Sequence, residues 1–70
     1  MGQQGHLLRL DHIGIVVTTL DAGRATLAKL FDIRRWTQEF RDEVNRVYVQ
    51  FGRDPTGVCY ELIAPLAADS

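Results

Sequence analysis

The sequence lacks an excess of charge of either sign. Its 70 residues contain 8 Lys and Arg against 9 Asp and Glu, which gives a formal net charge of -1 at pH 7. Nucleic-acid-binding domains usually carry a basic excess, and disordered chains combine a large net charge with few apolar residues. Because 46% of the residues are hydrophobic, we predict a folded protein that does not bind nucleic acid.

The sequence also lacks a long apolar run and has almost no cysteine. Its longest apolar stretch, residues 13–17, is interrupted by Gly14 and is far too short to span a bilayer. The first residues lack the charged and apolar regions of a signal peptide. Cys59, the one cysteine, cannot form a disulfide within the chain. We therefore expect no membrane partner and a cytoplasmic location.

The length of the chain allows one small domain. A domain of this size buries only about 60% of the surface of its unfolded chain, so it is marginally stable without a disulfide, a metal or a partner. We therefore expect a partner or a bound ion. Residues 1–8, rich in Gly and Gln, are predicted to be a flexible N-terminus, and residues 9–70 are predicted to form the domain.

Hydrophobic periodicity predicts the element order β-α-β-β-β. The predicted strands cover residues 10–17, 33–40, 44–51 and 58–64, and the predicted helix covers residues 21–31. Thr18 or Thr19 can cap the helix, and Asp32 can end it because Asp tolerates left-handed backbone geometry. The apolar stripe expected on the helix consists of Gly23, Leu27, Leu30 and Phe31.

Alternation divides the predicted strands into two faces. The face expected to pack on the helix carries Ile13, Ile15, Val17, Val47, Val49, Phe51, Val58, Tyr60 and Leu62. The other face carries His12, Gly14, Val16, Arg46, Tyr48, Gln50, Cys59, Glu61 and Ile63. This second face is too polar for a core and too apolar for an ordinary solvated surface. Such a mixture is typical of a cavity wall or an interface.

Three stretches carry a family resemblance: residues 10–17 with Asp11-His12, residues 19–21, and residues 60–66 with Glu61. In this order and spacing they resemble one module of the vicinal oxygen chelate superfamily, which includes glyoxalases and bleomycin-resistance proteins. The resemblance covers residues 9–70 and is closest to the methylmalonyl-CoA epimerase-like branch. It implies an α+β fold, a βαβββ module whose four-stranded mixed sheet has one helix on one face.

The resemblance implies a metal site formed by His12 and Glu61. The metal would be a divalent ion such as Zn, Co, Ni, Mn or Mg. Strand parity independently puts both residues on the same face. Two ligands do not complete a catalytic metal site, which needs at least three. A homodimer, or a second module, would supply both residues twice and form an eight-stranded cup.

The activity implied by the resemblance is that of a metal-dependent lyase, isomerase or epimerase acting on a small carbonyl or thioester substrate. Glu61 and Glu43 are the candidate general bases. The epimerases have a further catalytic glutamate before the third strand, where this chain has Arg41 with Glu43 nearby. Two alternatives stay open. One is a metal-free module that binds or sequesters a small molecule, and the other is an inactive N-terminal half of a two-module protein.

Overall fold

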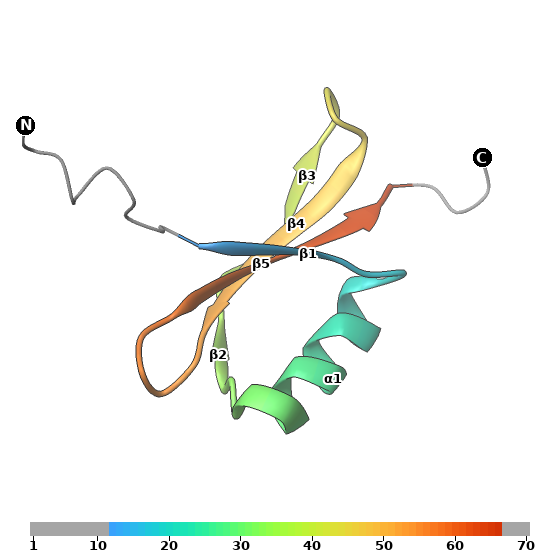
Figure 1. Ribbon diagram of the computed structural model, residues 1–70. Helices are drawn as coiled ribbons and strands as arrows, with labels where there is room; N and C mark the ends of the chain where they lie inside the picture. Colours follow the sequence, from blue (N-terminus) through green and yellow to red (C-terminus); the bar gives the residue numbers. More distant parts are fainter. Residues whose placement is uncertain (1–11, 67–70) are drawn as a thin grey trace, which may run out of the picture.

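The computed structural model describes residues 12–66, and the predicted flexible segment 1–8 lies outside this range. In chain order the elements are β1 (Ile13–Val16), α1 (Leu20–Phe31), β2 (Arg35–Trp36), β3 (Phe40–Asp42), β4 (Val47–Arg53) and β5 (Cys59–Pro65). The strands form one sheet in the order β1-β5-β4-β2, and β3 also pairs with β4. β1 runs parallel to β5, and the other pairs are antiparallel. Helix α1 covers one face of this sheet (Figure 1).

Helix α1 begins and ends at the predicted positions to within one residue. The hydroxyl oxygen of Thr19 accepts a hydrogen bond of 3.1 Å from the backbone N–H of Ala22, which caps the first turn. Asp32 follows the last turn in the left-handed region, with φ 56°. Residues 12–66 contain no helix with the length and hydropathy needed to cross a membrane.

The sheet has five strands where four were predicted, because the segment predicted as residues 33–40 is interrupted by a β-bulge. Arg35 and Trp36 pair with Arg53 and Gly52, whereas Phe40 pairs with Val49. From Trp36 to Phe40 the edge strand advances four residues, while β4 advances three, from Gly52 to Val49. The extra residue splits the edge strand into β2 and β3.

Hydrogen bonds at Thr37 replace the regular ladder at this bulge. The backbone N–H of Thr37 donates to the Phe51 carbonyl at 2.8 Å. The N–H of Phe51 donates at 3.1 Å to the Thr37 hydroxyl rather than to a carbonyl. The displaced Thr37 carbonyl accepts instead from the side-chain amide of Gln50 at 2.5 Å. Both backbone polar groups of Thr37 therefore have hydrogen-bond partners, although the residue is exposed.

The predicted orientation of strand 44–51 was wrong. β4 begins at Val47, after a turn in which Arg46 has φ 57°. Gln50 lies opposite the buried Leu62 and is itself buried, so Tyr48, Gln50 and Gly52 face the helix. The alternating residues Val47, Val49 and Phe51 therefore lie on the open face. Alternation predicted the strand but could not orient it, because both of its faces carry large side chains.

A polar network explains why a glutamine faces the helix. Arg24 of α1 donates one hydrogen bond of 2.6 Å to the side-chain carbonyl of Gln50 and another of 3.1 Å to Glu39. Asp21, one turn earlier on the helix, also pairs with Arg24. With the bond that Gln50 donates to Thr37, both ends of the buried amide have partners, which offsets the cost of removing it from water. The network ties α1 to the bulge.

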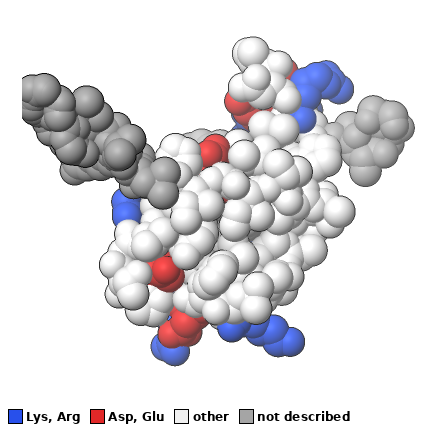
Figure 2. All heavy atoms as spheres, viewed as in Figure 1, with Lys and Arg blue, Asp and Glu red and all other residues white. Residues whose placement is uncertain are grey.

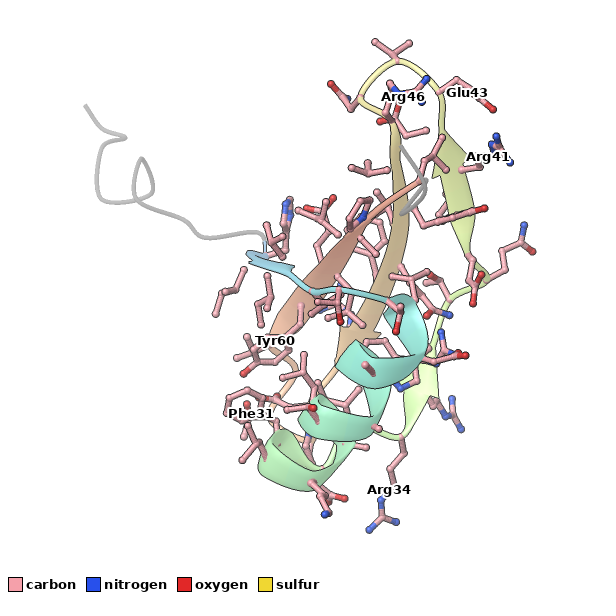
Figure 3. The ribbon with its side chains drawn as sticks, turned by 90° about the vertical axis from the view of Figure 1, so that its right-hand side faces the viewer. Phe31, Arg34, Arg41, Glu43, Arg46 and Tyr60 are labelled. Atoms are coloured by element: carbon pink, nitrogen blue, oxygen red, sulfur yellow. The ribbon has the colours of Figure 1, made fainter. Side chains whose placement is uncertain are left out.

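The core lies between α1 and the sheet. Its buried residues are Leu20, Leu27, Ile33, Tyr60, Leu62 and Ala64. Charged side chains lie mostly around the edge of the view in Figure 2. Leu30, expected on the buried stripe, is 66% exposed. Phe31, also expected on this stripe, is 39% exposed, although its ring stacks on that of Tyr60 with centroids 5.1 Å apart (Figure 3).

Gly52 and Gly14 provide a matched test of this packing. A Cβ on Gly52 would lie 2.5 Å from a Trp36 ring carbon and 2.9 Å from the Ile33 side chain, whereas one on Gly14 would have no neighbour closer than 3.6 Å. We expect Gly52→Ala to lower the free energy of unfolding by about 2–3 kcal/mol through overpacking. Gly14→Ala should leave it unchanged or slightly higher. Urea denaturation of both variants checks this, and equal stabilities would contradict the packing of Trp36.

Candidate functional site

The open face of the sheet is divided into an apolar end and a polar end by its register. One row of paired residues runs Val16, Ile63, Val49 and Phe40, all apolar. The next row contains Gly14, Glu61 and Phe51, and the row beyond contains Cys59, Arg53 and Arg35. No helix of residues 12–66 packs on this face, and Val16 is 78% exposed. Chemistry-bearing side chains therefore gather at one end of an otherwise apolar surface.

His12 and Glu61 meet at the polar end. The His12 Nε2 atom lies 3.0 Å from Glu61 Oε1, with side-chain exposures of 44% and 21%. The parallel pairing of β1 with β5 brings them together, because it places Gly14 directly beside Glu61. The His12 ring also meets the Phe51 ring edge-on, with centroids 5.9 Å apart. The two residues predicted from opposite ends of the chain thus share one face and are in contact.

Glu43 does not join this pair. It lies in the turn between β3 and β4, where the guanidinium of Arg41 donates to it at 2.5 Å. Arg41, Glu43 and Arg46 lie around this turn in Figure 3. The turn precedes Val47, at the opposite end of β4 from Phe51, the residue that pairs with Glu61. Within one copy of the chain, Glu61 is therefore the candidate base that lies beside His12.

The donor set can contribute part of a metal site. Imidazole nitrogen and carboxylate oxygen are ligands that divalent transition metals accept. Two ligand atoms that are each about 2.1 Å from one ion and at right angles are roughly 3 Å apart, which matches the observed 3.0 Å. Residues 12–66 contain no group of three or more His, Cys, Asp or Glu side chains that could hold a metal. Ligands beyond His12 and Glu61 would therefore have to come from outside residues 12–66 of the same chain.

A cavity of about 930 Å³ opens next to the pair, at the edge formed by β2 and β4. Its lining includes Arg35, Trp36, Phe51, Arg53, Pro55 and Cys59. Phe51 belongs to both sites, since it also contacts His12. Arg53 was missed because the predicted strand ended at residue 51, whereas β4 extends to Arg53. The alternation Phe51-x-Arg53 puts it on the open face, where it pairs with Cys59.

Asp54 organises the turn that borders this cavity. One of its carboxylate oxygens accepts from the backbone N–H and hydroxyl of Thr56 and from the N–H of Val58, and the other accepts from the Tyr60 hydroxyl. The Thr56 hydroxyl is the main cause of a pKa for Asp54 below its ordinary 3.8. The pKa of Tyr60 is raised, first by burial and then by the carboxylate of Asp54.

Comparison with known families identifies the fold. Residues 11–70 match the family model of the Glyoxalase/Bleomycin resistance protein/Dioxygenase superfamily. The chain belongs to this superfamily. The resemblance predicted from the three sequence stretches is thereby confirmed at the level of the superfamily, and so is the α+β fold with its mixed sheet. No curated protein matches the chain.

A solved structure agrees with this membership. The crystal structure of SMU.1112c is similar to this chain, with 30% identity and a TM-score of 0.58. The similarity covers 77% of this chain but only 39% of SMU.1112c. The matched part of the chain thus spans about two fifths of the length of that protein.

The contact between His12 and Glu61 should contribute little to folding. Both side chains are reached by solvent, and exposed pairs of this kind contribute about 0–1 kcal/mol. We expect His12→Ala and Glu61→Gln to change the free energy of unfolding by less than about 1 kcal/mol. Leu62→Ala, which truncates a fully buried side chain, should cost about 2–5 kcal/mol in the same denaturation assay. A loss for Glu61→Gln as large as that for Leu62→Ala would indicate a structural role.

The turn at Asp54 should make stability depend on pH in acid. Because the folded-state pKa of Asp54 lies below 3.8, its carboxylate contributes stability above that value. This contribution is lost as the pH falls through the folded-state pKa. Thermal unfolding between about pH 2 and pH 5 should therefore show a smaller acid-induced decrease for Asp54→Asn than for the unmodified chain. An identical decrease in both would contradict the assignment.

Proposed function

We propose that the chain is one module of a metal-dependent lyase, isomerase or epimerase that acts on a small carbonyl or thioester substrate. The observation that supports this most directly is the 3.0 Å contact between His12 Nε2 and Glu61 Oε1 on the uncovered face. Membership of the superfamily supports it independently. Within the superfamily, the methylmalonyl-CoA epimerase-like branch is the proposed relative, on the sequence stretches that contain His12 and Glu61.

The proposed site is completed by a second copy of the chain. His12 and Glu61 provide two ligands, fewer than a catalytic metal needs. A two-fold axis would bring the same pair from each copy to one ion, without requiring any new residue. The apolar row from Val16 to Phe40 supports such an arrangement. Its residues lie on the same face as the pair, and Val16 and Phe40 are exposed in the isolated chain.

In this proposal a divalent ion bound by His12 and Glu61 would act as a Lewis acid toward oxygen atoms of the substrate. Glu61 has a second role, because a carboxylate in contact with one partner through Oε1 can still accept a proton through Oε2. The phenyl ring of Phe51 contacts the His12 imidazole edge-on. The same ring, with Cys59, forms an apolar part of the cavity lining.

Native mass spectrometry of the full chain, purified without chelator and supplied with a divalent metal, tests this proposal. We expect a dimer that carries metal in the unmodified chain and no metal in His12→Ala or Glu61→Gln. Glu43→Gln is the matched control, since it removes a carboxylate at the far end of β4 and should keep the metal.

Three results would contradict the proposal. A dimer without metal would favour the metal-free binding module. A monomer without metal would favour a module that needs a different second half. Loss of metal in Glu43→Gln as well as in Glu61→Gln would show that metal binding does not depend on the contact between His12 and Glu61.

A further inference from the structure

The cavity beside His12 and Glu61 carries an arginine pair that no other feature of the fold explains. Arg35 of β2 and Arg53 of β4 are directly opposite each other in the antiparallel ladder. Both line the cavity of about 930 Å³. Like charges at directly opposed positions destabilise a sheet. Charge on an edge strand discourages aggregation, but that effect requires neither a second arginine opposite the first nor a cavity between them.

The acidic side chains that line the cavity form no ion pair with Arg35 or Arg53. Asp32 forms an ion pair with Arg34, whose side chain points away from the sheet in Figure 3. The carboxylate of Asp54 is occupied by donors from its own turn and by Tyr60. Neither Arg35 nor Arg53 forms an ion pair with an acidic side chain of residues 12–66. Two cationic side chains therefore face a cavity without a carboxylate partner from the described chain.

The exposed side chain of Arg53 makes one hydrogen bond within the turn between β4 and β5. One of its terminal nitrogens donates a hydrogen bond of 2.8 Å to the carbonyl of Gly57. A guanidinium has five N–H donors in a planar fork, so the remaining donors stay available for a carboxylate or a phosphate. The adjacent wall is apolar, being formed by Phe51, Cys59 and Pro55. The cavity thus combines a guanidinium with free donors and a surface suited to a carbon skeleton, within the usual volume of ligand pockets, about 300–1,000 Å³.

We propose that this cavity binds a small organic anion, with Arg35 and Arg53 holding its carboxylate or phosphate group. The substrate of the proposed reaction would then be anionic. Its body would lie along Phe51 and Cys59, and its other end would reach His12 and Glu61. The orientation toward His12 and Glu61 rests on the proposed function, whereas anion binding by the arginine pair does not require it.

The register gives the spacing of the strand positions that such a ligand would connect. Arg53 is one strand away from Glu61 and two residues along the strand from Phe51, the residue that pairs with Glu61. With strands about 4.8 Å apart and about 6.8 Å per two residues, the backbone positions of Arg53 and Glu61 are roughly 8 Å apart. A molecule of a few bonds can span this distance. A short organic acid or phosphate ester is therefore long enough to extend from one of these strand positions to the other.

Two residues can report the binding of an anion in the cavity without an assay of enzymatic activity. Trp36 and Cys59 both line the cavity, and the chain has one Trp and one Cys. Benzoate, with benzamide as its uncharged analogue, is a suitable pair of probes. We expect benzoate to change the fluorescence of Trp36 with saturation and to slow the labelling of Cys59 by a maleimide. Benzamide should do neither at the same concentration.

Charge variants identify the arginines that are responsible. Arg35→Gln and Arg53→Gln should each weaken benzoate binding by about tenfold, because each removes charge-assisted hydrogen bonds. Arg53→Lys should lose part of the affinity, since it keeps the charge but not the planar fork. Arg41→Gln is the matched control and should bind benzoate normally, because Arg41 pairs with Glu43 at the far end of β4. Circular dichroism confirms that each variant is folded.

The results separate this inference from the proposed function. Benzoate binding that depends on Arg35 and Arg53 in metal-free protein supports the anion site even if no metal binds. Equal effects of benzoate and benzamide on both reporters would overturn it, and so would unchanged affinity in both Gln variants. Metal binding that depends on His12 without any response to benzoate would leave the proposed function intact and reject the anion site.

Discussion

The pairing of β4 with β5 is the constraint on which the rest of the structure depends. Its register runs without interruption from Val47 opposite Pro65 to Arg53 opposite Cys59. Once Leu62 faces the helix, this register determines which residues of β4 also face it. The parallel pairing of β1 with the same strand then aligns Gly14 with Glu61 and brings His12 within reach. The pairing of β5 with β4 and with β1 thus positions the core residues, the contact between His12 and Glu61, and the residues of β4 and β5 that line the cavity.

The sequence predicted those features that depend on local chemistry. Thr19 caps α1 and Asp32 ends it because capping and left-handed geometry are properties of single residues and their neighbours. The shared face of His12 and Glu61 was also predictable, since each strand carries its own alternation. The superfamily could be recognised for a related reason. The stretches that contain these two residues, 10–17 and 60–66, can each be read from their own residues without knowing the contacts of the rest of the chain.

Other features could not be predicted, because they depend on contacts between distant segments. The orientation of β4 places Gln50 in the interior, where Arg24 and Thr37 satisfy its side-chain amide. Nothing within strand 47–53 shows that its glutamine has these partners. The bulge that separates β2 from β3 also involves distant segments. There the N–H of Phe51 donates to the hydroxyl of Thr37 in place of its carbonyl. Arg53 could be placed on the open face only once the orientation of β4 and its extension to residue 53 were known.

The bulge also determines how the sheet can grow. β2 and β3 are two and three residues long, and a strand interrupted in this way is a poor template for a further strand. On the opposite side the described sheet ends at the uninterrupted β1. A sheet with two regular edges can add copies indefinitely and form a fibre. A sheet with one regular edge closes after two copies related by a two-fold axis. The extra residue at the bulge thus leaves β1 as the one regular edge of the described sheet.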